Sequence, residues 1–352
     1  MKRIYSIDFF KLLFVYLIAL SHIDIRIPGY ECAVVFFFIL SGYFLARKFY
    51  SKKAANISYS GAQYTLDHIK SLYPHYILSF AVMLAYFCVR NAYHIHTGIT
   101  TATPWADMPT KIYNLIPELF MMQNIGFFDG GMNYPLWQVS TLVICGYFIY
   151  TLLRYNEKLS TQIIFPVAIL LIQVYLKGDI DTFGTVGIFY IPMVRAFSAI
   201  SFGVLVFKLL HSEIYAKNFA QHKLALNICS ILSLITVFVF HDNQMLLITS
   251  VFIIAALVEP TSWLNKVFNH KIFSSFGELS YAVYLNHALI VWFMYDFVPD
   301  IFRVLGIPSN TFITGAVFFI GLTVYSVITL ALVKHFKKKR EIKKAAAKIT
   351  AA

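Results

Sequence analysis

Charged residues are scarce in this sequence. Asp, Glu, Lys and Arg make up 13% of its 352 residues, against about 25% in soluble domains. Apolar residues account for 59% of the chain, and the mean hydropathy is +0.68. This composition excludes an ordinary soluble domain and indicates an integral membrane protein.

Cysteine is also rare, and the four cysteines are scattered along the chain: Cys32, Cys88, Cys145 and Cys229. No C-x-x-C spacing occurs, so the sequence indicates neither a disulfide framework nor a zinc site. His94 and His96 form a lone pair without the remaining ligands of a metal site, so no metal is expected. No small-residue cleavage site follows the first apolar run, and we expect that run to be a membrane span and not a signal peptide.

Hydrophobic runs recur from residue 8 to residue 334 with short polar breaks between them. We therefore expect one all-α membrane domain over residues 1–336, followed by a basic cytoplasmic tail over residues 337–352. About ten runs are candidate membrane-spanning helices, namely 7–23, 33–46, 74–92, 134–153, 161–176, 188–210, 224–241, 244–259, 277–297 and 311–334. The runs 33–46 and 244–259 are short for an upright span, which is consistent with tilted or re-entrant segments.

The distribution of basic residues predicts the orientation of these helices. With the N-terminus inside, 22 Lys and Arg residues lie on the cytoplasmic side and five lie outside, while Lys11 and Arg195 lie within spans. Basic residues accumulate on the cytoplasmic side of membrane proteins, so both termini are expected inside. The net charge of +12 then describes one face of a membrane protein, and nucleic acid is not needed as a partner to explain it.

The first apolar run contains two ionisable residues, Lys11 and His22. Their separation is close to three helical turns, so both face the same way, roughly 16 Å apart along the axis. Such groups inside a membrane cost several kcal/mol without a partner or a water-filled cavity, so they indicate a functional site. The structural alternatives are an ion pair between Lys11 and Asp8, and an interfacial His22 in contact with water and Asp24.

A second polar stripe lies in the run 277–297. Ser280, Tyr284 and His287 follow one another at helical spacing and share one side of the predicted helix. The stripe is expected to face a cavity or another helix, and hydrogen bonding between helices is its structural alternative. The small pair Ser41 and Gly42 in the second run is typical of close helix packing.

Several local patterns occur in a collinear order along the chain. They are the basic residue and histidine at 11 and 22, FFFILSGYFL (36–45), KSLYPHY (70–76), NYPLWQVS (133–140), a weaker RAFSAISFGVLV (195–206), and LSYAVYLNHALI (279–290). Together they resemble the membrane acyltransferase 3 family, multi-span enzymes that O-acylate cell-surface glycans and related molecules. The chain differs in having Lys11 where many relatives have Arg, and Leu142 where some relatives have Glu.

The resemblance implies an O-acyltransferase, in the simplest case an O-acetyltransferase, in the cell (inner or plasma) membrane. Its donor would be acetyl-CoA or another acyl-CoA in the cytoplasm, and its acceptor a surface glycan, a lipid-linked sugar or another exported molecule. Acyl transfer to a hydroxyl needs a base, and imidazole suits that role near neutral pH. His22 is then the candidate base and His287 a second catalytic candidate, while Lys11 lines the route of the donor and Lys70 meets the CoA phosphates.

Arg195 and Trp137 are further candidates for substrate binding. Arg195 would stabilise a developing oxyanion or the substrate, and its alternative is a side chain that reaches the lipid headgroups. Trp137 would stack on a sugar ring, and its alternative is an interface anchor. Lys70 has a plain alternative as an ordinary positive-inside residue. The longest exterior connection, residues 93–133, is the expected place of acceptor recognition.

A competing hypothesis is an exporter or transporter of a glycan or small molecule, which a bundle with intramembrane charges also suits. Transporters often contain two matching halves, and no such repeat is found between the first five and last five runs. The sequence therefore favours the enzyme. A third hypothesis is a signalling domain that keeps the fold without acyl transfer.

Overall fold

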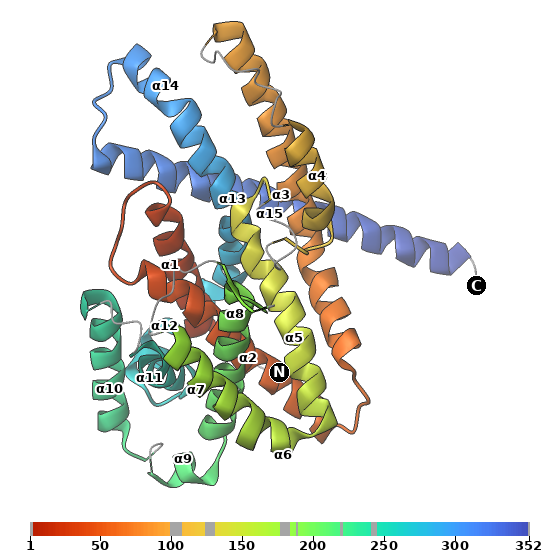
Figure 1. The fold of residues 1–352 in the computed structure, drawn as a ribbon, viewed down its shortest axis with the longest axis vertical. Coiled ribbons are helices and arrows are strands. Elements are labelled where there is room, and N and C mark those ends of the chain that lie inside the picture. Colours follow the sequence, from red (N-terminus) through yellow and green to blue (C-terminus); the bar gives the residue numbers. More distant parts are fainter. Residues whose placement is uncertain are drawn as a thin grey trace.

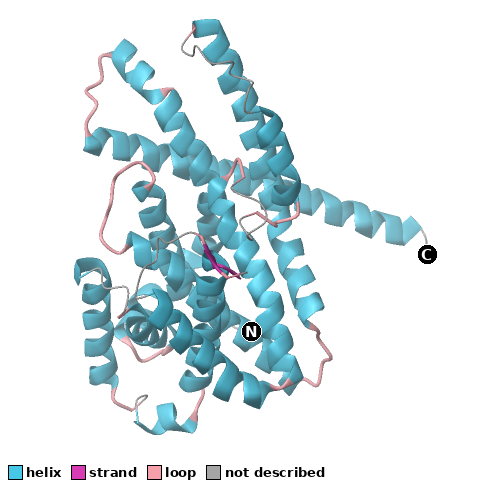
Figure 2. Cartoon of the chain, viewed as in Figure 1, coloured by secondary structure: helices cyan, strands magenta, loops and turns pink. Residues whose placement is uncertain are grey.

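The computed structural model describes residues 3–98, 108–123, 131–176, 184–187, 189–218, 221–240 and 245–350. Within these ranges the regular structure is helical, apart from one antiparallel hairpin of β1 (Thr185–Val186) and β2 (Phe189–Tyr190) (Figure 2). The predicted all-α class is therefore confirmed for the described residues.

The helices range from short turns to two very long helices near the start and at the end of the chain. In chain order the helical segments are α1 (Tyr5–Ser21), α2 (Tyr30–Ala54), α3 (Gly61–Thr97), α4 (Met108–Leu119), the 3-10 segment η1 (Tyr134–Leu136), α5 (Trp137–Tyr155), α6 (Glu157–Leu159), the π segment η2 (Ser160–Ile164), α7 (Phe165–Leu176), α8 (Ile191–Leu210), α9 (Glu213–Asn218), α10 (Lys223–Ile235), the π segment η3 (Thr236–Phe240), α11 (Leu246–Val258), α12 (Trp263–Phe268), the 3-10 segment η4 (Lys271–Ser275), α13 (Phe276–Asp296), α14 (Val298–Leu305) and α15 (Thr311–Thr350).

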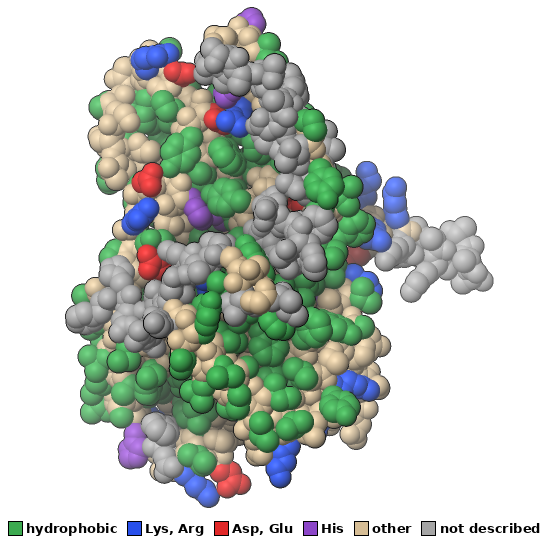
Figure 3. Space-filling view, viewed as in Figure 1, with side chains coloured by type: hydrophobic (Ala, Val, Ile, Leu, Met, Phe, Trp, Pro, Cys, Tyr) green, Lys and Arg blue, Asp and Glu red, His purple; other side chains and the backbone are tan. Residues whose placement is uncertain are grey.

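Six helices in the described part of the chain are long and apolar enough to cross a membrane: α2, α3, η1 with α5, α6 to α7, α8, and α15 as far as Lys343. The apolar helices α10, continued by η3, and α11 are shorter. Hydrophobic side chains cover much of the visible face, above all in its lower half, and charged side chains lie at its lower edge, on the tail of α15 and in its upper part (Figure 3). This surface is that of a polytopic membrane protein.

The centre of the bundle is the crossing of α2 with α8 (Figure 1). Gly42 of α2 packs against the backbone of Ile200, and Gly203 of α8 packs against the backbone of Ile39. The two glycines thus let the two helices approach with main chain against main chain, as small residues do in membrane bundles. The close packing predicted for the Ser41 and Gly42 pair is confirmed at Gly42.

Helix α1 contacts both α2 and α13, and α13 in turn contacts α3 and α15. The contact between α1 and α15 includes a 2.6 Å hydrogen bond between the hydroxyls of Tyr16 and Thr323. Ser6 donates a 2.7 Å hydrogen bond from α1 to the carbonyl of Leu257. Helix α1 is therefore surrounded by protein, and its Lys11 and His22 lie at the junction of α1, α2, α5 and α13.

Two predicted spans had boundaries that were too narrow. The run 33–46 is part of the 25-residue helix α2, and the run 74–92 is part of the 37-residue helix α3. Proline commonly opens a helix, but α3 passes through Pro74 and begins at a capping box of Ser60 and Gln63. Neighbouring helices let a membrane helix continue through a proline. Helix α13 packs against this part of α3, where Tyr281 donates a hydrogen bond to the Leu72 carbonyl (3.4 Å).

The basic tail predicted from residue 337 continues the last helix without a break. Helix α15 runs through residue 334, where the hydrophobic run ends, and on to Thr350. Lys and Arg have good helix propensity, so the helix persists after its apolar face has ended.

Replacement of Gly42 by alanine is expected to destabilise the bundle. An added Cβ would overlap the carbonyl of Ile200, which belongs to helix backbone and cannot rotate away. Overpacking of this kind costs about 1–3 kcal/mol, so Gly42→Ala should lower the thermal unfolding temperature of the detergent-solubilised protein. Gly321→Ala in α15 is the matched control, because a Cβ there meets nothing within 4 Å. Equal unfolding temperatures for the two variants would contradict the close crossing of α2 and α8.

Candidate active site

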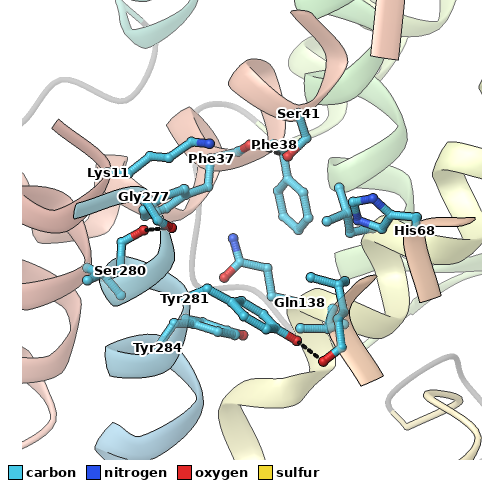
Figure 4. A pocket seen from close by; sticks show the side chains of 14 residues that line it. Lys11, Phe37, Phe38, Ser41, His68, Gln138, Gly277, Ser280, Tyr281 and Tyr284 are labelled. Atoms are coloured by element: carbon cyan, nitrogen blue, oxygen red, sulfur yellow. Dashed lines mark hydrogen bonds between the residues drawn. The ribbon is translucent and has the colours of Figure 1, made fainter. Parts of the chain in front are cut away.

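Two cavities follow one another inside the bundle and share two side chains. The first, which we call the Lys11 cavity, has a volume of about 270 Å³ and is drawn in Figure 4. The second, the His22 cavity, has a volume of about 180 Å³. Gln138 of α5 and Tyr284 of α13 line both cavities. The two spaces therefore adjoin at Gln138 and Tyr284.

Lys11 points into the first cavity, where its Nζ lies over the ring of Phe44 at 4.9 Å from the centroid (Figure 4). An aromatic face attracts an ammonium group electrostatically. Asp8 pairs with Arg3, with 2.5 Å between Arg3 Nε and the carboxylate. In the part of the chain that is described, no salt bridge within 4 Å joins Asp8 to Lys11, although the Asp8 carboxylate is near enough to act on the Lys11 charge electrostatically.

His22 lies at the end of α1 in the second cavity. Its imidazole stacks on that of His287, with 5.3 Å between ring centroids and 20° between the planes. The Tyr134 ring meets His22 edge-on at 5.2 Å. Asp24 instead accepts a 3.1 Å hydrogen bond from Tyr295, whose hydroxyl also lies 3.2 Å from the His22 carbonyl. The structure thus brings the two predicted catalytic histidines together.

His287 is completely buried, and its hydrogen bonding fixes its tautomer. Nδ1 lies 2.7 Å from the carbonyl oxygen of Tyr284. A carbonyl only accepts hydrogen bonds, so Nδ1 must carry the proton, and in the neutral ring Nε2 is the basic atom. Nε2 has no hydrogen-bond partner among the described residues. A buried ring nitrogen in this state is able to accept a proton or a hydrogen bond.

The polar stripe of α13 connects the two cavities. Ser280 lines the Lys11 cavity, Tyr284 lines both cavities, and His287 contacts His22. The Tyr284 hydroxyl donates a hydrogen bond to the Pro135 carbonyl, and Ser280 donates one to the Gly277 carbonyl at 3.0 Å. The stripe therefore faces both a cavity, at Ser280 and Tyr284, and a neighbouring segment, at the Pro135 carbonyl.

Arg195 and Trp137 both line the His22 cavity, as the sequence predicted for substrate-binding residues. Arg195 is only 4% exposed. A side chain that reached the lipid headgroups would be open to its surroundings, so that alternative for Arg195 is wrong. The guanidinium instead brings a fixed positive charge to the wall of the cavity that contains His22.

Lys70 lines neither the Lys11 cavity nor the His22 cavity. It lines a separate pocket with Tyr73 of α3 and Arg340 of α15, whereas His68 and Leu72 of the same helix line the Lys11 cavity. Lys70 is therefore not brought together with Lys11, although both stood as donor-binding candidates.

The lining of the two cavities includes residues that were not predicted, among them Glu31, His68 and Gln138. Gln138 lies within the NYPLWQVS pattern, which could have pointed to it. Glu31 and His68 lie near helix ends outside the apolar runs, where polar residues are common and carry no signal of their own.

A buried carboxyl group binds the residues directly before η1. Both oxygens of Glu118 accept backbone hydrogen bonds, from Met132 at 2.9 Å and from Asn133 at 3.1 Å. The Asn133 side chain donates to Ser79 of α3 at 3.0 Å and to the Leu285 carbonyl of α13 at 2.9 Å. This network holds the start of η1, whose Tyr134 and Pro135 form a wall of the His22 cavity.

Part of the connection expected to recognise the acceptor, residues 99–107 and 124–130, lies outside the described residues. Its described part includes α4, which carries Glu118, and the residues just before η1. Among the described residues there is no group of three or more His, Cys, Asp or Glu side chains placed to hold a metal ion.

A family model described as an acyltransferase domain matches residues 4–332. The chain belongs to this acyltransferase family. It is 24% identical over 350 residues to the peptidoglycan O-acetyltransferase OatA of Listeria monocytogenes serovar 1/2a (strain ATCC BAA-679 / EGD-e), which covers 90% of this chain and 55% of that relative. The chain thus spans about half the length of OatA.

Shorter matches within the family come from Staphylococcus aureus. The proteins named "Putative O-acetyltransferase SACOL0978" (strain COL) and "Putative O-acetyltransferase SAS0844" (strain MSSA476) are each 34% identical over 53 residues, which is 15% of this chain and 9% of each relative. No solved structure matches the chain. Family membership confirms the resemblance drawn from the sequence patterns.

Protonation of Glu118 is expected to control the order of the loop beside the His22 cavity. Burial raises the pKa of Glu118 to about 7, against the opposing effect of the two backbone donors. Because this pKa is above that of an unfolded glutamate, its stabilising contribution is complete at about pH 4 and is lost as the pH rises through 7. Hydrogen-exchange protection of the Met132 and Asn133 amides, corrected for intrinsic rates, should therefore fall between pH 5.5 and pH 8.5.

The Glu118→Gln variant is the control for this pH dependence. Its amide does not titrate and, like the protonated carboxyl group, keeps one carbonyl acceptor, so protection should be close to the wild-type value at pH 5.5 and nearly independent of pH. A wild-type profile that is retained in Glu118→Gln would assign the titration to another group.

Proposed function

We propose that this chain is a membrane-embedded O-acyltransferase that moves an acyl group, in the simplest case acetyl, from cytoplasmic acyl-CoA to a hydroxyl of a surface glycan or another exported acceptor. The observation that carries the proposal is the pair of adjacent cavities that share Gln138 and Tyr284. Two consecutive spaces inside a bundle suit a reaction whose substrates arrive from opposite sides. Membership of the acyltransferase family supports the type of reaction.

The proposed topology has about ten crossings. Besides the six long apolar helices, α1, α10 with η3, α11 and α13 would also cross. With both termini inside, as the basic residues predict, Lys11 lies nearer the cytoplasm and His22 nearer the outside of the cell membrane. The extended arm of acyl-CoA would then run through the Lys11 cavity, and its thioester would end beside Gln138 and Tyr284.

In the proposed reaction His22 removes the proton from the acceptor hydroxyl while the hydroxyl oxygen attacks the thioester carbonyl. The new C–O bond forms, the C–S bond breaks, and the proton passes from the imidazolium to the departing CoA thiolate. Atoms and charge balance without a further reactant. His287 supports this step, because its stacked and neutral ring offers Nε2 to a proton or a hydrogen bond next to His22.

The remaining polar groups suit the other needs of acyl transfer. Negative charge develops on the carbonyl oxygen as the hydroxyl attacks, and a fixed cation in a site closed to water stabilises it strongly. Arg195 is buried in the wall of the His22 cavity and is the residue placed for this role. Trp137 in the same wall offers an aromatic face for the acceptor.

The acceptor class is proposed from the relative and from the position of the cavity. The Listeria relative is named for peptidoglycan O-acetylation. In this chain the η1 wall and the Glu118 network lie at the outer side of the His22 cavity in the proposed topology. A glycan hydroxyl presented from outside would reach His22 past this wall.

Removal of the His22 imidazole should abolish most of the acyl transfer. We expect His22→Ala to reduce the turnover of labelled acetyl-CoA with a glycan acceptor by about 10²- to 10⁴-fold, the usual range for a general base. His335→Ala, which removes an exposed imidazole from α15, is the control and should retain full activity. Unfolding temperatures of both variants would verify that they are folded. Transfer at the wild-type rate by folded His22→Ala would remove His22 from the mechanism.

A further inference from the structure

A pocket between α3 and α15 lies apart from the two cavities of the proposed reaction. Its volume is about 570 Å³, and its charged lining consists of Lys70 from α3 and Arg340 from α15. Tyr73 of α3 forms part of the same wall. Helices α3 and α15 are far apart in sequence but cross in the fold (Figure 1), so the two cations are brought together by tertiary structure.

The pocket opens on the side of α3 that faces away from the Lys11 cavity. His68 and Leu72, one helical turn apart, line the Lys11 cavity, whereas Lys70 and Tyr73 line the α3–α15 pocket. Lys70 is two residues from both His68 and Leu72, which places it on the opposite face of the helix. A ligand in the α3–α15 pocket is therefore separated from Lys11 by the body of α3.

The carboxylate nearest to Lys70 in sequence, that of Asp67, contacts other partners: Lys48 at 3.7 Å and the hydroxyl of Tyr59. Lys334, also on α15, forms a 2.6 Å ion pair with Glu278. No ion pair of Lys70 or Arg340 occurs within the residues for which the structure gives side chains. Two unpaired cations from facing helices suit a phosphate group, to which the Arg guanidinium donates two parallel hydrogen bonds.

An apolar row leads from the cations along α15 into the hydrophobic part of the helix. Ile328, Leu332 and Phe336 precede Arg340 at intervals of four residues, so all four side chains follow one line on the helix surface. All three apolar side chains are exposed. A phosphate that carries hydrocarbon chains can contact both the cations and the apolar row. A soluble phosphate compound can contact only the cations.

We propose that the α3–α15 pocket binds the headgroup of an anionic glycerophospholipid. Its phosphodiester contacts Lys70 and Arg340, and its acyl chains lie along Phe336, Leu332 and Ile328. Basic pockets between membrane helices bind anionic headgroups in this manner. This inference goes beyond the proposed acyl transfer and assigns Lys70 to a lipid and not to the donor.

The test is a binding measurement on purified full-length protein in a neutral detergent, with phosphatidylglycerol and phosphatidylcholine as probes and native mass spectrometry as readout. Wild type should retain phosphatidylglycerol in preference to phosphatidylcholine. The double variant Lys70→Gln, Arg340→Gln should bind phosphatidylglycerol about 10- to 30-fold more weakly, as expected from the loss of two headgroup charges.

A double variant on the same tail provides the matched control. Lys338→Gln with Lys339→Gln removes the same total charge, here entirely from α15, but neither residue lines the pocket, so phosphatidylglycerol binding should remain within about twofold of wild type. If both double variants lost phosphatidylglycerol binding equally, general electrostatic attraction would explain the loss, and the proposal would be overturned. Displacement of the lipid by acetyl-CoA at similar concentration would also overturn it, because the pocket would then bind the phosphates of the donor.

Discussion

An ammonium group and two imidazoles inside an apolar helical bundle are the constraint on which the rest of this structure depends. Each such group loses several kcal/mol of hydration unless protein or water replaces it. The fold meets this demand with enclosed polar spaces: Lys11 lies over the ring of Phe44, and His22 stacks on His287. The cavities are the places where hydration is replaced, and for that reason they are also the places where a polar substrate can enter.

The packing of the bundle determines where these spaces lie. Gly42 and Gly203 bring α2 and α8 together backbone to backbone. Helix α1 meets α13 on its other side, and there the stripe of Ser280, Tyr284 and His287 replaces apolar contacts with polar ones. The close packing on one side of α2 and the polar side chains beside α1 together determine where the Lys11 cavity and the His22 cavity lie.

Much of the site was predictable because it depends on spacing within single helices. Lys11 and His22 share a face of α1, and Ser280, Tyr284 and His287 share a face of α13, as the helical repeat requires. Residues that share one face of a helix do so in any fold that contains this helix. The collinear patterns indicated the type of reaction, which helical spacing alone does not indicate. The family match over residues 4–332 confirms the resemblance that these patterns carry.

The features that the sequence did not predict depend on contacts between distant segments. Pro74 suggested a helix start, but α3 runs through it from a capping box at Ser60 and lies against α13 there. Lys70 looked like a partner of Lys11, yet two residues of helical rotation turn it toward Arg340. Glu118 gave no signal at all, because its role depends on two backbone groups 14 and 15 residues further along the chain.

The central claim is that donor and acceptor reach the His22 cavity from opposite sides through the space bounded by Gln138 and Tyr284. The most direct test uses proteoliposomes in which the protein has one known orientation, acetyl-CoA is added only on the side of the basic tail, and a glycan acceptor is present only on the other side. The account predicts acetylated glycan under this separation, at a rate similar to that with both substrates on both sides. Product that forms only when donor and acceptor share one side would contradict it.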